Sequence, residues 1–214
     1  MFLYGAGGHA RVVRDILESQ GLKVSGIYDD NLNVAKWMEY EVSHNFHTDD
    51  DVIVCIGKAE YRKTVVEKLR QLEIKFGTAV HLSAIVSPFA EIGEGSVLMA
   101  GTIVNSGSQI GRHCIINTGA VVEHECLTGD YVHISPNTTL CGGLSIGEGT
   151  WIGAGAVVAQ GVKIGKWSII GAGSVVLNDI PDGVVAYGTP CRVIRKLIDT
   201  EINRYEKTYQ SNDL

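Results

Sequence analysis

The sequence predicts two folded units in series: a small α/β domain over residues 1–78 and a long column of stacked coils over residues 79–190. Three observations carry this prediction. Strand-like and helix-like segments alternate in the first unit, while aliphatic residues recur every six positions and glycines every 18 positions in the second. Residues 191–214 are then a C-terminal cap and tail. With 214 residues and 45% hydrophobic content, the chain is long enough to build both cores.

The composition narrows the class of protein further. The chain has no run of about 18 apolar residues and no secretory signal at its start, so we expect a cytoplasmic protein without membrane insertion. A formal net charge of -6 without a basic run disfavours a nucleic-acid partner. The five cysteines form no C-x-x-C pair and mostly have small apolar neighbours, so we interpret them as reduced core residues.

The first 78 residues alternate between strands and helices. The segment FLYGAGGHARVVRDILESQG predicts a strand, a glycine turn and an amphipathic helix with Val12, Val13, Ile16 and Leu17 on one side. KVSGIYDD and DVIVCIG predict two further strands, and YRKTVVEKLRQL a second helix. This βαβ order indicates a Rossmann-like parallel sheet, which binds ligands at the carboxyl ends of its strands.

A G-x-G-x-x-A turn opens the first helix. Gly5, Gly7 and Ala10 would let backbone N–H groups approach a pyrophosphate at the helix N-terminus. Asp29, roughly 20 residues further on, suits a nucleotide ribose or base. A domain that ends near residue 78 is too short for a complete dinucleotide fold, so a nucleotide-sugar fits better than NAD. A tight turn without a ligand is the alternative.

The column is predicted from its repeat. Each 18-residue coil would be a triangular turn of three short strands, with an aliphatic side chain pointing inward from each hexad. Glycine would take a corner conformation that a side chain would strain. A β-sandwich, the alternative fold, gives no reason for glycines to recur every 18 residues over so long a stretch. The hexad positions are Val80, Val86, Ile92, Leu98, Val104, Ile110, Ile116, Val122, Thr128, Ile134, Leu140, Ile146, Ile152, Val158, Ile164, Ile170 and Val176, and the phased glycines are Gly93, Gly111, Gly129, Gly147 and Gly165.

A titratable cluster interrupts this repeat in VVEHECLTGD. One coil away from His124 lie the small residues Ser106 and Gly142, which leaves space beside the imidazole for a substrate. The Gly142 N–H is a candidate oxyanion donor. His124 would take a proton from an attacking amine or hydroxyl, and Glu125, or failing that Glu123, would orient it.

Two other interpretations of the cluster stay open at this point. The polar residues could belong to a solvent-facing loop of the column. Cys126, two residues from His124, could be a rival nucleophile.

The hexad pattern resembles the hexapeptide-repeat acyltransferases, whose fold is a left-handed parallel β-helix. The resemblance covers residues 80–190, including the closing segment VVAYGTPCRVIRK. Across nearly the whole chain, GAGGH, YDD, IGKAEYRK, INTGAVVEHECLTGD and VHISP resemble bacterial nucleotide-activated amino-sugar N-acetyltransferases of the bacillosamine-pathway type and their sialic acid O-acetyltransferase-like relatives.

The resemblance implies acetyl-coenzyme A as donor, a homotrimer with active sites between columns, and His124 and Glu125 as catalytic base and partner. It also implies a set of binding residues. Those for the nucleotide-sugar are Gly7, Gly8, His9, Asp29, Asp30 and Gly57, with Asn117 near the acceptor amine; those for coenzyme A are His133, Ala154 and Ala172, with Gly142 beside them. Ala154 and Ala172 are 18 residues apart, so the repeat also stacks them.

The expected reaction is acetyl transfer to the amine of a nucleotide-linked 4-amino-4,6-dideoxy sugar for surface glycan biosynthesis. The amine would attack the thioester directly, with no metal and no covalent enzyme intermediate. Sugar or sialic acid O-acetylation is the nearest alternative.

Two further readings belong to other functional classes. A γ-type carbonic anhydrase would need three zinc-binding histidines, but His113, His124 and His133 lack the close pair expected there. A scaffold that binds a nucleotide-sugar without turnover is the other. A metal at His44, His47 and Asp49 to Asp51 is less favoured than a solvated loop.

Overall fold

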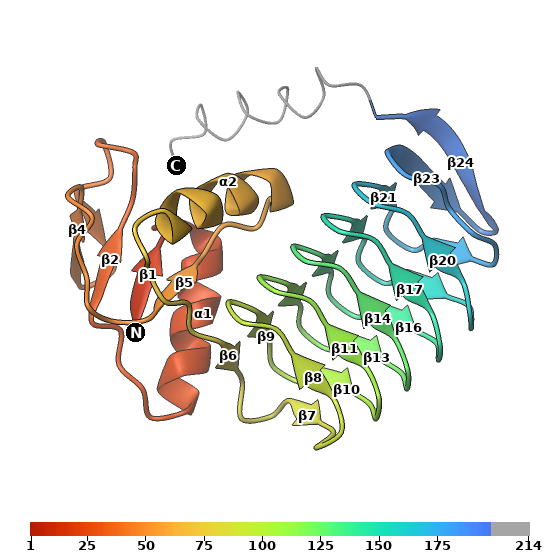
Figure 1. Cartoon of the computed structure of the whole chain (residues 1–214), viewed down its shortest axis with the longest axis horizontal. Coiled ribbons are helices and arrows are strands. Elements are labelled where there is room, and N and C mark those ends of the chain that lie inside the picture. Colours follow the sequence, from red (N-terminus) through yellow and green to blue (C-terminus); the bar gives the residue numbers. More distant parts are fainter. Residues whose placement is uncertain (198–214) are drawn as a thin grey trace.

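The computed structural model describes residues 1–197. A compact α/β domain at one end adjoins a column of short parallel strands, as predicted (Figure 1). The last helix of the domain ends at Arg70, and the first strand of the column begins at Ala79. The predicted cap and tail over residues 191–214 lies partly outside the described residues, which exclude 198–214.

The sheet of the α/β domain has the order β3-β4-β2-β1-β5. Its centre is the predicted parallel set of β1 (Phe2–Tyr4), β2 (Gly26–Tyr28) and β5 (Val52–Val54). The structure adds an edge hairpin of β3 (Lys36–Trp37) and β4 (Tyr40–Ser43), which the sequence analysis missed. Its signals were the alternation in YEVS and the two-residue turn before it, where Met38 has a φ of 51°.

Two helices cover opposite faces of this sheet. Helix α1 (Gly8–Ser19) packs with Leu3 and Ile27, and α2 (Ala59–Arg70) packs with Tyr4 and Tyr28. The predicted apolar side of α1 is wrong at Val12, which is 37% exposed. The buried positions are instead Ala10, Val13, Ile16 and Leu17, a set that follows the helical period. No helix within residues 1–197 has the length and apolarity needed to cross a membrane.

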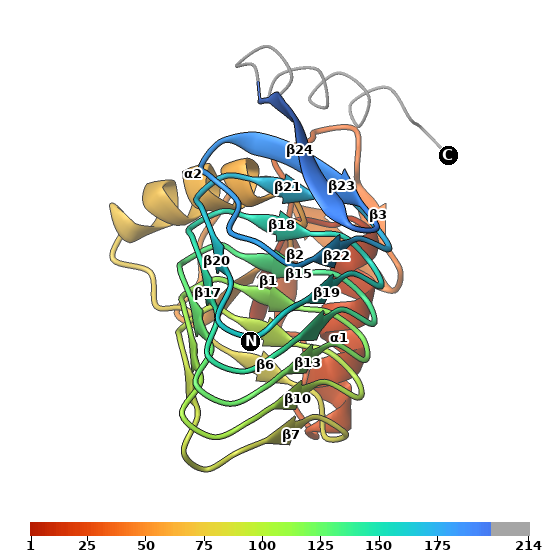
Figure 2. The same cartoon turned by 90° about the vertical axis from the view of Figure 1, so that its right-hand side faces the viewer.

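The column is a parallel β-helix with three faces, and Figure 2 shows its coils stacked on one another. The domain-side face contains β6 (Ala79–Val80), β9 (Val97–Leu98), β12 (Ile115–Ile116), β15 (His133–Ile134), β18 (Trp151–Ile152) and β21 (Ile169–Ile170). The aliphatic face contains β7 (Ile85–Val86), β10 (Ile103–Val104), β13 (Val121–Val122), β16 (Thr139–Leu140), β19 (Val157–Val158) and β22 (Val175–Val176). The polar face contains β8 (Glu91–Ile92), β11 (Gln109–Ile110), β14 (Leu127–Thr128), β17 (Ser145–Ile146) and β20 (Lys163–Ile164).

The strand register confirms the 18-residue coil. Ile103 pairs with Val121, and Val121 pairs with Thr139, each 18 residues further along the chain. The hexad residues point inward: Val104 and Val122 are fully buried in one continuous core. The end of the column is closed by β23 (Val184–Gly188) and β24 (Cys191–Lys196), which pair antiparallel.

The 18-residue glycine phase has a different cause from the one predicted. Gly93 and its equivalents are not in the left-handed region; a Cβ on Gly93 would lie only 2.6 Å from the backbone of Gly111 in the next coil. Glycine is needed there because successive coils approach closely. The left-handed corners fall two residues later in each hexad, for example at Gly95 with a φ of 71°.

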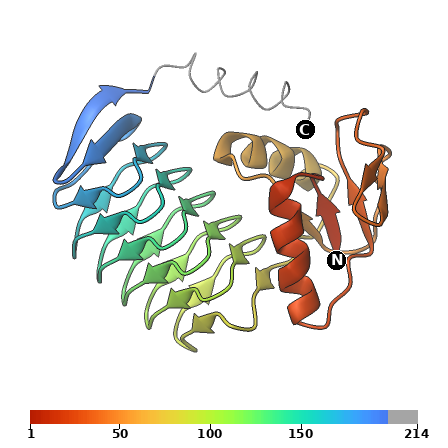
Figure 3. The same cartoon turned by 180° about the vertical axis from the view of Figure 1, so that it is seen from behind.

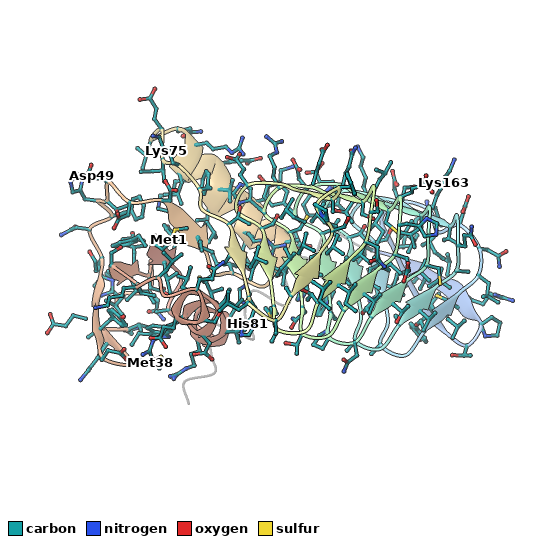
Figure 4. The ribbon with its side chains drawn as sticks, turned by 90° about the horizontal axis from the view of Figure 1, so that it is seen from below. Met1, Met38, Asp49, Lys75, His81 and Lys163 are labelled. Atoms are coloured by element: carbon teal, nitrogen blue, oxygen red, sulfur yellow. The ribbon has the colours of Figure 1, made fainter. Side chains whose placement is uncertain are left out.

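The α/β domain packs on the first coils of the column. Figure 3 shows α1 between the sheet of the domain and the column, and Val97 and Ile115 of the domain-side face are buried in one cluster with Val13 of α1. In Figure 4, His81 lies where the domain meets the column, and Lys163 lies towards the far end.

Candidate active site

The predicted catalytic pair lies at the corner between β13 and β14. His124 Nδ1 is 3.2 Å from Glu125 Oε2, and the two side chains are 54% and 75% exposed. Glu125 has a φ of 57° at a corner where the neighbouring coils carry Gly107 and Gly143. A non-glycine residue in this region costs roughly 1–3 kcal/mol. At this corner the neighbouring coils carry glycine at the same position, so the strain arises in the coil in which a carboxylate reaches the imidazole.

Gly142 leaves the space that the imidazole occupies. A Cβ on Gly142 would lie 2.5 Å from both Cε1 and Nε2 of His124, so any side chain there would displace the ring. Within residues 1–197, the Gly142 N–H donates to no protein acceptor, while its carbonyl accepts from Gly161. The corner therefore presents a histidine, its carboxylate partner and a backbone donor together.

Ser108 fixes this corner from the coil beneath. Its Oγ donates to the Glu123 carbonyl at 2.7 Å and accepts from the Cys126 N–H at 3.1 Å. The Gly143 N–H also donates to the His124 carbonyl at 2.9 Å. The sequence analysis did not single out Ser108 as a site residue; its signal was the row of small residues before each hexad position. In the described part of the chain, the carboxylate of Glu123, the second candidate partner, forms no hydrogen bond or ion pair with the imidazole; the Glu123 carbonyl accepts from Ser108.

Cys126 is poorly placed to be a nucleophile. Its side chain is fully buried, and its thiol donates to the Cys141 carbonyl at 3.2 Å. Burial raises the pKa of the Cys126 thiol, which disfavours the reactive thiolate. The thiol interpretation of this motif therefore has no support in the geometry.

A second group of predicted residues meets where the glycine turns of the α/β domain face β15. Asn117 Nδ2 lies 3.2 Å from His133 Nε2, and the Thr118 N–H donates to Asn117 Oδ1 at 2.8 Å. Burial lowers the pKa of His133 to about 3, assisted by the charge of Arg62 and by the neighbouring His9, and opposed by a backbone hydrogen bond to Gly57. His133 is therefore a neutral imidazole.

His9 belongs to the same group, which we call the acceptor cluster: His9, Gly57, Asn117 and His133. The pKa of His9 is lowered to about 4, first by burial and then by the charge of Arg62. Its Nε2 is buried and has no hydrogen-bond partner among the described residues. A buried, unpaired imidazole nitrogen is a candidate ligand contact, because leaving it unsatisfied costs free energy.

The glycine turn and Asp29 are brought together as predicted. Gly7 caps α1 without a side-chain hydrogen bond, and a Cβ on Gly7 or Gly8 would meet nothing within 4 Å. The Asp29 carboxylate accepts from the Ala6 N–H at 2.7 Å and from the Asn31 N–H at 2.9 Å. Asp29 therefore holds the turn against the end of β2, and the start of α1 stays open to a ligand.

Asp30 lies on the opposite face of the sheet. Its carboxylate accepts from the Tyr4 hydroxyl at 2.6 Å and the Tyr28 hydroxyl at 3.0 Å, and Lys68 Nζ lies 3.3 Å away. These groups outweigh its partial burial and hold the pKa of the Asp30 carboxyl below its usual range. The structure does not bring Asp30 into contact with the glycine turn, because successive strand residues point to opposite faces.

The proposed coenzyme A residues line the corner that follows the domain-side face. Ala154 and Ala172 are both exposed, and the Gly173 N–H donates to the Ala154 carbonyl at 2.8 Å. His133 lies on β15, one coil before β18, which leads into the corner of Ala154. Its ring stacks on Trp151 of β18 with ring centroids 5.8 Å apart.

The two groups of predicted residues lie at different corners of the column. His124 lies at the corner between the aliphatic and polar faces, whereas Asn117 lies at the corner between the domain-side and aliphatic faces. Within residues 1–197, no three His, Cys, Asp or Glu side chains gather as metal ligands. His113, His124 and His133 thus do not form a three-histidine site within this chain.

Comparison with known proteins matches both units. The PglD N-terminal domain family covers residues 1–69, and the bacterial transferase hexapeptide repeat family covers residues 89–124 and 143–178. PerB from Caulobacter crescentus, solved in complex with CoA and GDP-perosamine, is 38% identical, with a TM-score of 0.84 over 91% of this chain and 96% of that chain. The chain belongs to the hexapeptide-repeat sugar acyltransferase family.

Two further members of the family are informative. The acetyltransferase domain of PglB from Neisseria gonorrhoeae FA1090, in complex with acetyl coenzyme A, is 34% identical, with a TM-score of 0.84 over 90% of this chain and 98% of that chain. UDP-N-acetylbacillosamine N-acetyltransferase from Bacillus subtilis (strain 168) is 40% identical over 113 residues, 46% of this chain and 50% of that enzyme. The match thus spans about half the length of this curated relative.

Arg62 is the residue of this acyltransferase that sequence reasoning missed most clearly. It is 1% exposed, and its guanidinium contacts the Gly57 turn as well as the column. The sequence showed it only as one basic residue of a helix that carries several, so nothing marked it as buried.

Proposed function

We propose that this acyltransferase moves the acetyl group of acetyl-coenzyme A to the amine of a nucleotide-linked 4-amino-4,6-dideoxy sugar. The observation that carries the proposal is the His124–Glu125 pair over Gly142. An accessible imidazole with a carboxylate partner suits a general base, and the free Gly142 N–H suits a developing oxyanion. Relatives bound to CoA with GDP-perosamine, and to acetyl coenzyme A, support the two substrates.

In the proposed reaction the sugar amine attacks the thioester carbonyl directly. His124 Nε2 accepts the proton lost by the attacking nitrogen, and Glu125 stabilises the imidazolium that forms. The Gly142 N–H stabilises the oxyanion of the tetrahedral intermediate. Collapse of that intermediate breaks the C–S bond, gives the acetamide and releases coenzyme A, which takes up a proton.

The nucleotide would anchor the sugar at the start of α1. The open N–H groups at Gly7 and Gly8 suit a pyrophosphate, and the acceptor cluster suits the sugar. Binding energy from the nucleotide would then position the amine. Coenzyme A would run along the exposed Ala154 and Ala172. We place the reaction in the cytoplasm, where acetyl-coenzyme A is available, and in surface glycan biosynthesis.

We further propose that the active enzyme is a homotrimer. The aliphatic face carries outward side chains with little reason to face water, including Ile85 and Val157, which are 64% and 38% exposed. A neighbouring copy on this face would also bring His124 of one chain towards the acceptor cluster of another. Val157→Lys should give a monomer in sedimentation and abolish turnover. Gln109→Lys, an equivalent outward change on the polar face, should leave the trimer intact.

The experiment that tests the function is an acetylation screen. UDP-, dTDP- and GDP-linked amino sugars, and free sialic acid, are incubated with acetyl-coenzyme A, and products are identified by mass spectrometry. Treatment with neutral hydroxylamine separates the amide from an ester, because only the O-acetyl ester is cleaved. No product with any amino sugar, or a hydroxylamine-labile product with sialic acid, would favour the alternatives of a binding scaffold or an O-acetyltransferase.

A matched pair of variants tests the nucleotide anchor. Asp29→Ala removes the support of the glycine turn and should lower kcat/KM for the nucleotide-sugar by about tenfold, without changing coenzyme A affinity. We keep Asp30 as a proposed nucleotide contact through its exposed side, and Asp30→Ala should have a smaller effect. Equal kcat/KM for the same amino sugar with and without its nucleotide would remove the anchor from the proposal.

A further inference from the structure

Arg62 is a fully buried cation that joins the two units of the protein. Its guanidinium donates only to backbone carbonyls: Nε to His113 at 2.8 Å, Nη1 to Ile56 and Gly57 at 2.7 Å each, and Nη2 to Tyr131 at 2.7 Å. Ile56 and Gly57 belong to the α/β domain, whereas His113 and Tyr131 belong to two successive coils. Arg62 therefore fixes the Gly57 turn against the column.

The charge of Arg62 is buried among neutral backbone groups. Among the described residues it forms no ion pair, although buried arginines are seldom found unpaired. Burial lowers the pKa of Arg62 to about 10, so the guanidinium stays charged at neutral pH. The titratable groups around it are Glu60 on its own helix, His9 at the start of α1, and His113, Cys114, Tyr131 and His133 on the column.

The acceptor cluster lies next to this charge. Gly57 accepts a hydrogen bond from Arg62 and also contacts His133 through its backbone, and His133 contacts Asn117. His9 and His133 are neutral, and no carboxylate within residues 1–197 contributes to the lowered pKa of either histidine. The acceptor cluster thus places uncharged imidazole and amide groups next to a fixed positive charge, which reaches it through Gly57.

We propose that Arg62 is a positioning residue that makes the acceptor cluster select the neutral amine of the sugar over its ammonium form. This inference rests on the proposed N-acetyltransferase function. An aliphatic amine in water has a pKa of about 8 to 10, so most of it is protonated at pH 7 and cannot attack a thioester. A fixed like charge in a site of low polarity lowers the pKa of the bound amine and favours its neutral form.

The proton balance of the step follows from this arrangement. The ammonium form releases one proton to solvent as the sugar binds, and the neutral amine keeps its lone pair for attack. His124 accepts the second proton only when the C–N bond forms. Arg62 remains protonated throughout and contacts no reacting atom, so its effect is on binding and on the pH dependence.

The first test is the number of protons released on binding. Full-length enzyme with His124→Asn, which cannot accept the proton or turn over, is titrated calorimetrically at pH 7 in buffers of different ionisation enthalpy. The probe is the nucleotide-linked amino sugar selected by the acetylation screen. We expect close to one proton released per amino sugar bound and none for its N-acetylated product. Binding of the amino sugar without proton release would overturn the inference.

The second test separates the charge of Arg62 from its hydrogen bonds. Arg62→Lys keeps the positive charge but loses the several N–H donors of the guanidinium. Arg62→Gln loses the charge. In Arg62→Gln the ionisation that limits kcat on the acid side should move up by about 1 pH unit, because kcat reports ionisations of the bound complex and the bound amine is no longer opposed by a cation. Arg62→Lys should lower kcat/KM at all pH values while keeping the wild-type pH profile of kcat.

Unshifted profiles in both variants would reduce Arg62 to a structural clamp. The proton-release test does not alter Arg62 and remains decisive if Arg62→Gln does not fold. If the screen finds no acetylated amino sugar, the proposed function fails and this inference with it. If acetylation occurs but binding releases no proton, only the inference fails.

Discussion

Two histidine-bearing regions of the same column meet opposite environments. At the open corner, the His124 side chain is 54% exposed and has a carboxylate 3.2 Å away. Under the α/β domain, His113 is fully buried, and the partner of His133 is the Asn117 amide. Since the coils repeat one backbone, the difference comes from what is stacked around each ring. Glycine neighbours open one region, and a second domain closes the other.

This contrast indicates how a repetitive fold acquires a local chemistry. A histidine that must gain and lose a proton needs access to solvent or substrate and an anion to support its charged form. A histidine that must stay neutral needs burial and a nearby cation. The corner supplies the first set of conditions through Gly142 and Glu125, and the domain interface supplies the second through Arg62.

The largest effect is expected from removing the accessible histidine. His124→Ala should lower kcat by roughly 10² to 10⁴-fold, the usual contribution of a general base, while the fold and coenzyme A binding persist. Steady-state kinetics and coenzyme A titration would measure this. Cys126→Ser, two residues away, is the control and should stay near wild type. A kcat close to wild type in His124→Ala would show that the exposed histidine is not the general base, and the contrast between the two regions would then lose its functional meaning.

A smaller loss is expected from closing the space beside that histidine. Gly142→Ala places a methyl group where Cε1 and Nε2 of His124 now lie, so the ring must move. A displacement of about 1 Å can cost about 10²-fold in rate, and we expect a loss of about 10- to 100-fold in kcat. Gln160→Ala, one coil above Gly142, is the matched control. Equal activity of the two variants would mean that the ring position is not critical.

An intermediate effect is expected from giving the buried region the kind of partner that His124 has. Asn117→Asp retains an acceptor for the Thr118 N–H but places a carboxylate beside His133 Nε2. The pKa of His133 should rise, and kcat/KM for the nucleotide-sugar should fall by about tenfold. NMR titration of the imidazole would detect the change. A His133 that remained neutral at pH 5 in this variant would contradict the electrostatic account.

Local sequence signals were sufficient for the repeat, the glycine turn and the open corner. The 18-residue period alone placed Gly142 beside His124 and stacked Ala154 on Ala172, because a coil converts sequence spacing directly into neighbourhood. The same logic could not locate Arg62, because two of its acceptors, His113 and Tyr131, are 51 and 69 residues away in the sequence. Nor could alternation place Asp29 and Asp30 together, since it sends them to opposite faces of the sheet.

The smallest effect on turnover, and a distinct effect on stability, is expected at His113. Its ring packs against Phe76 and Tyr131, both its nitrogens are buried without a partner among the described residues, and burial lowers its pKa to about 3 from 6.5. His113→Phe should be tolerated, because Tyr131 and Trp167 carry aromatic rings at the same corner with φ values of 62° and 52°. Turnover at pH 7.5 should change by less than about twofold, since the ring lies outside the acceptor cluster.

The stability effect has a definite sign. A histidine held neutral in the folded state stabilises the fold fully above its unfolded pKa of 6.5, and this contribution is lost as the pH falls towards about 3, because the unfolded chain then binds the proton more tightly. The loss is about 1.4 kcal/mol per pH unit, or about 2 kcal/mol at pH 5. Urea unfolding at a fixed protein concentration should show that acidification from pH 7.5 to 5 destabilises His113→Phe by about 2 kcal/mol less than wild type. In the exposed control His47→Phe, the same acidification should lower the free energy of unfolding by as much as in wild type. If His113→Phe also lost as much stability as wild type, the histidine under the domain would already be protonated at pH 5, and the contrast between the closed and open regions would not be electrostatic.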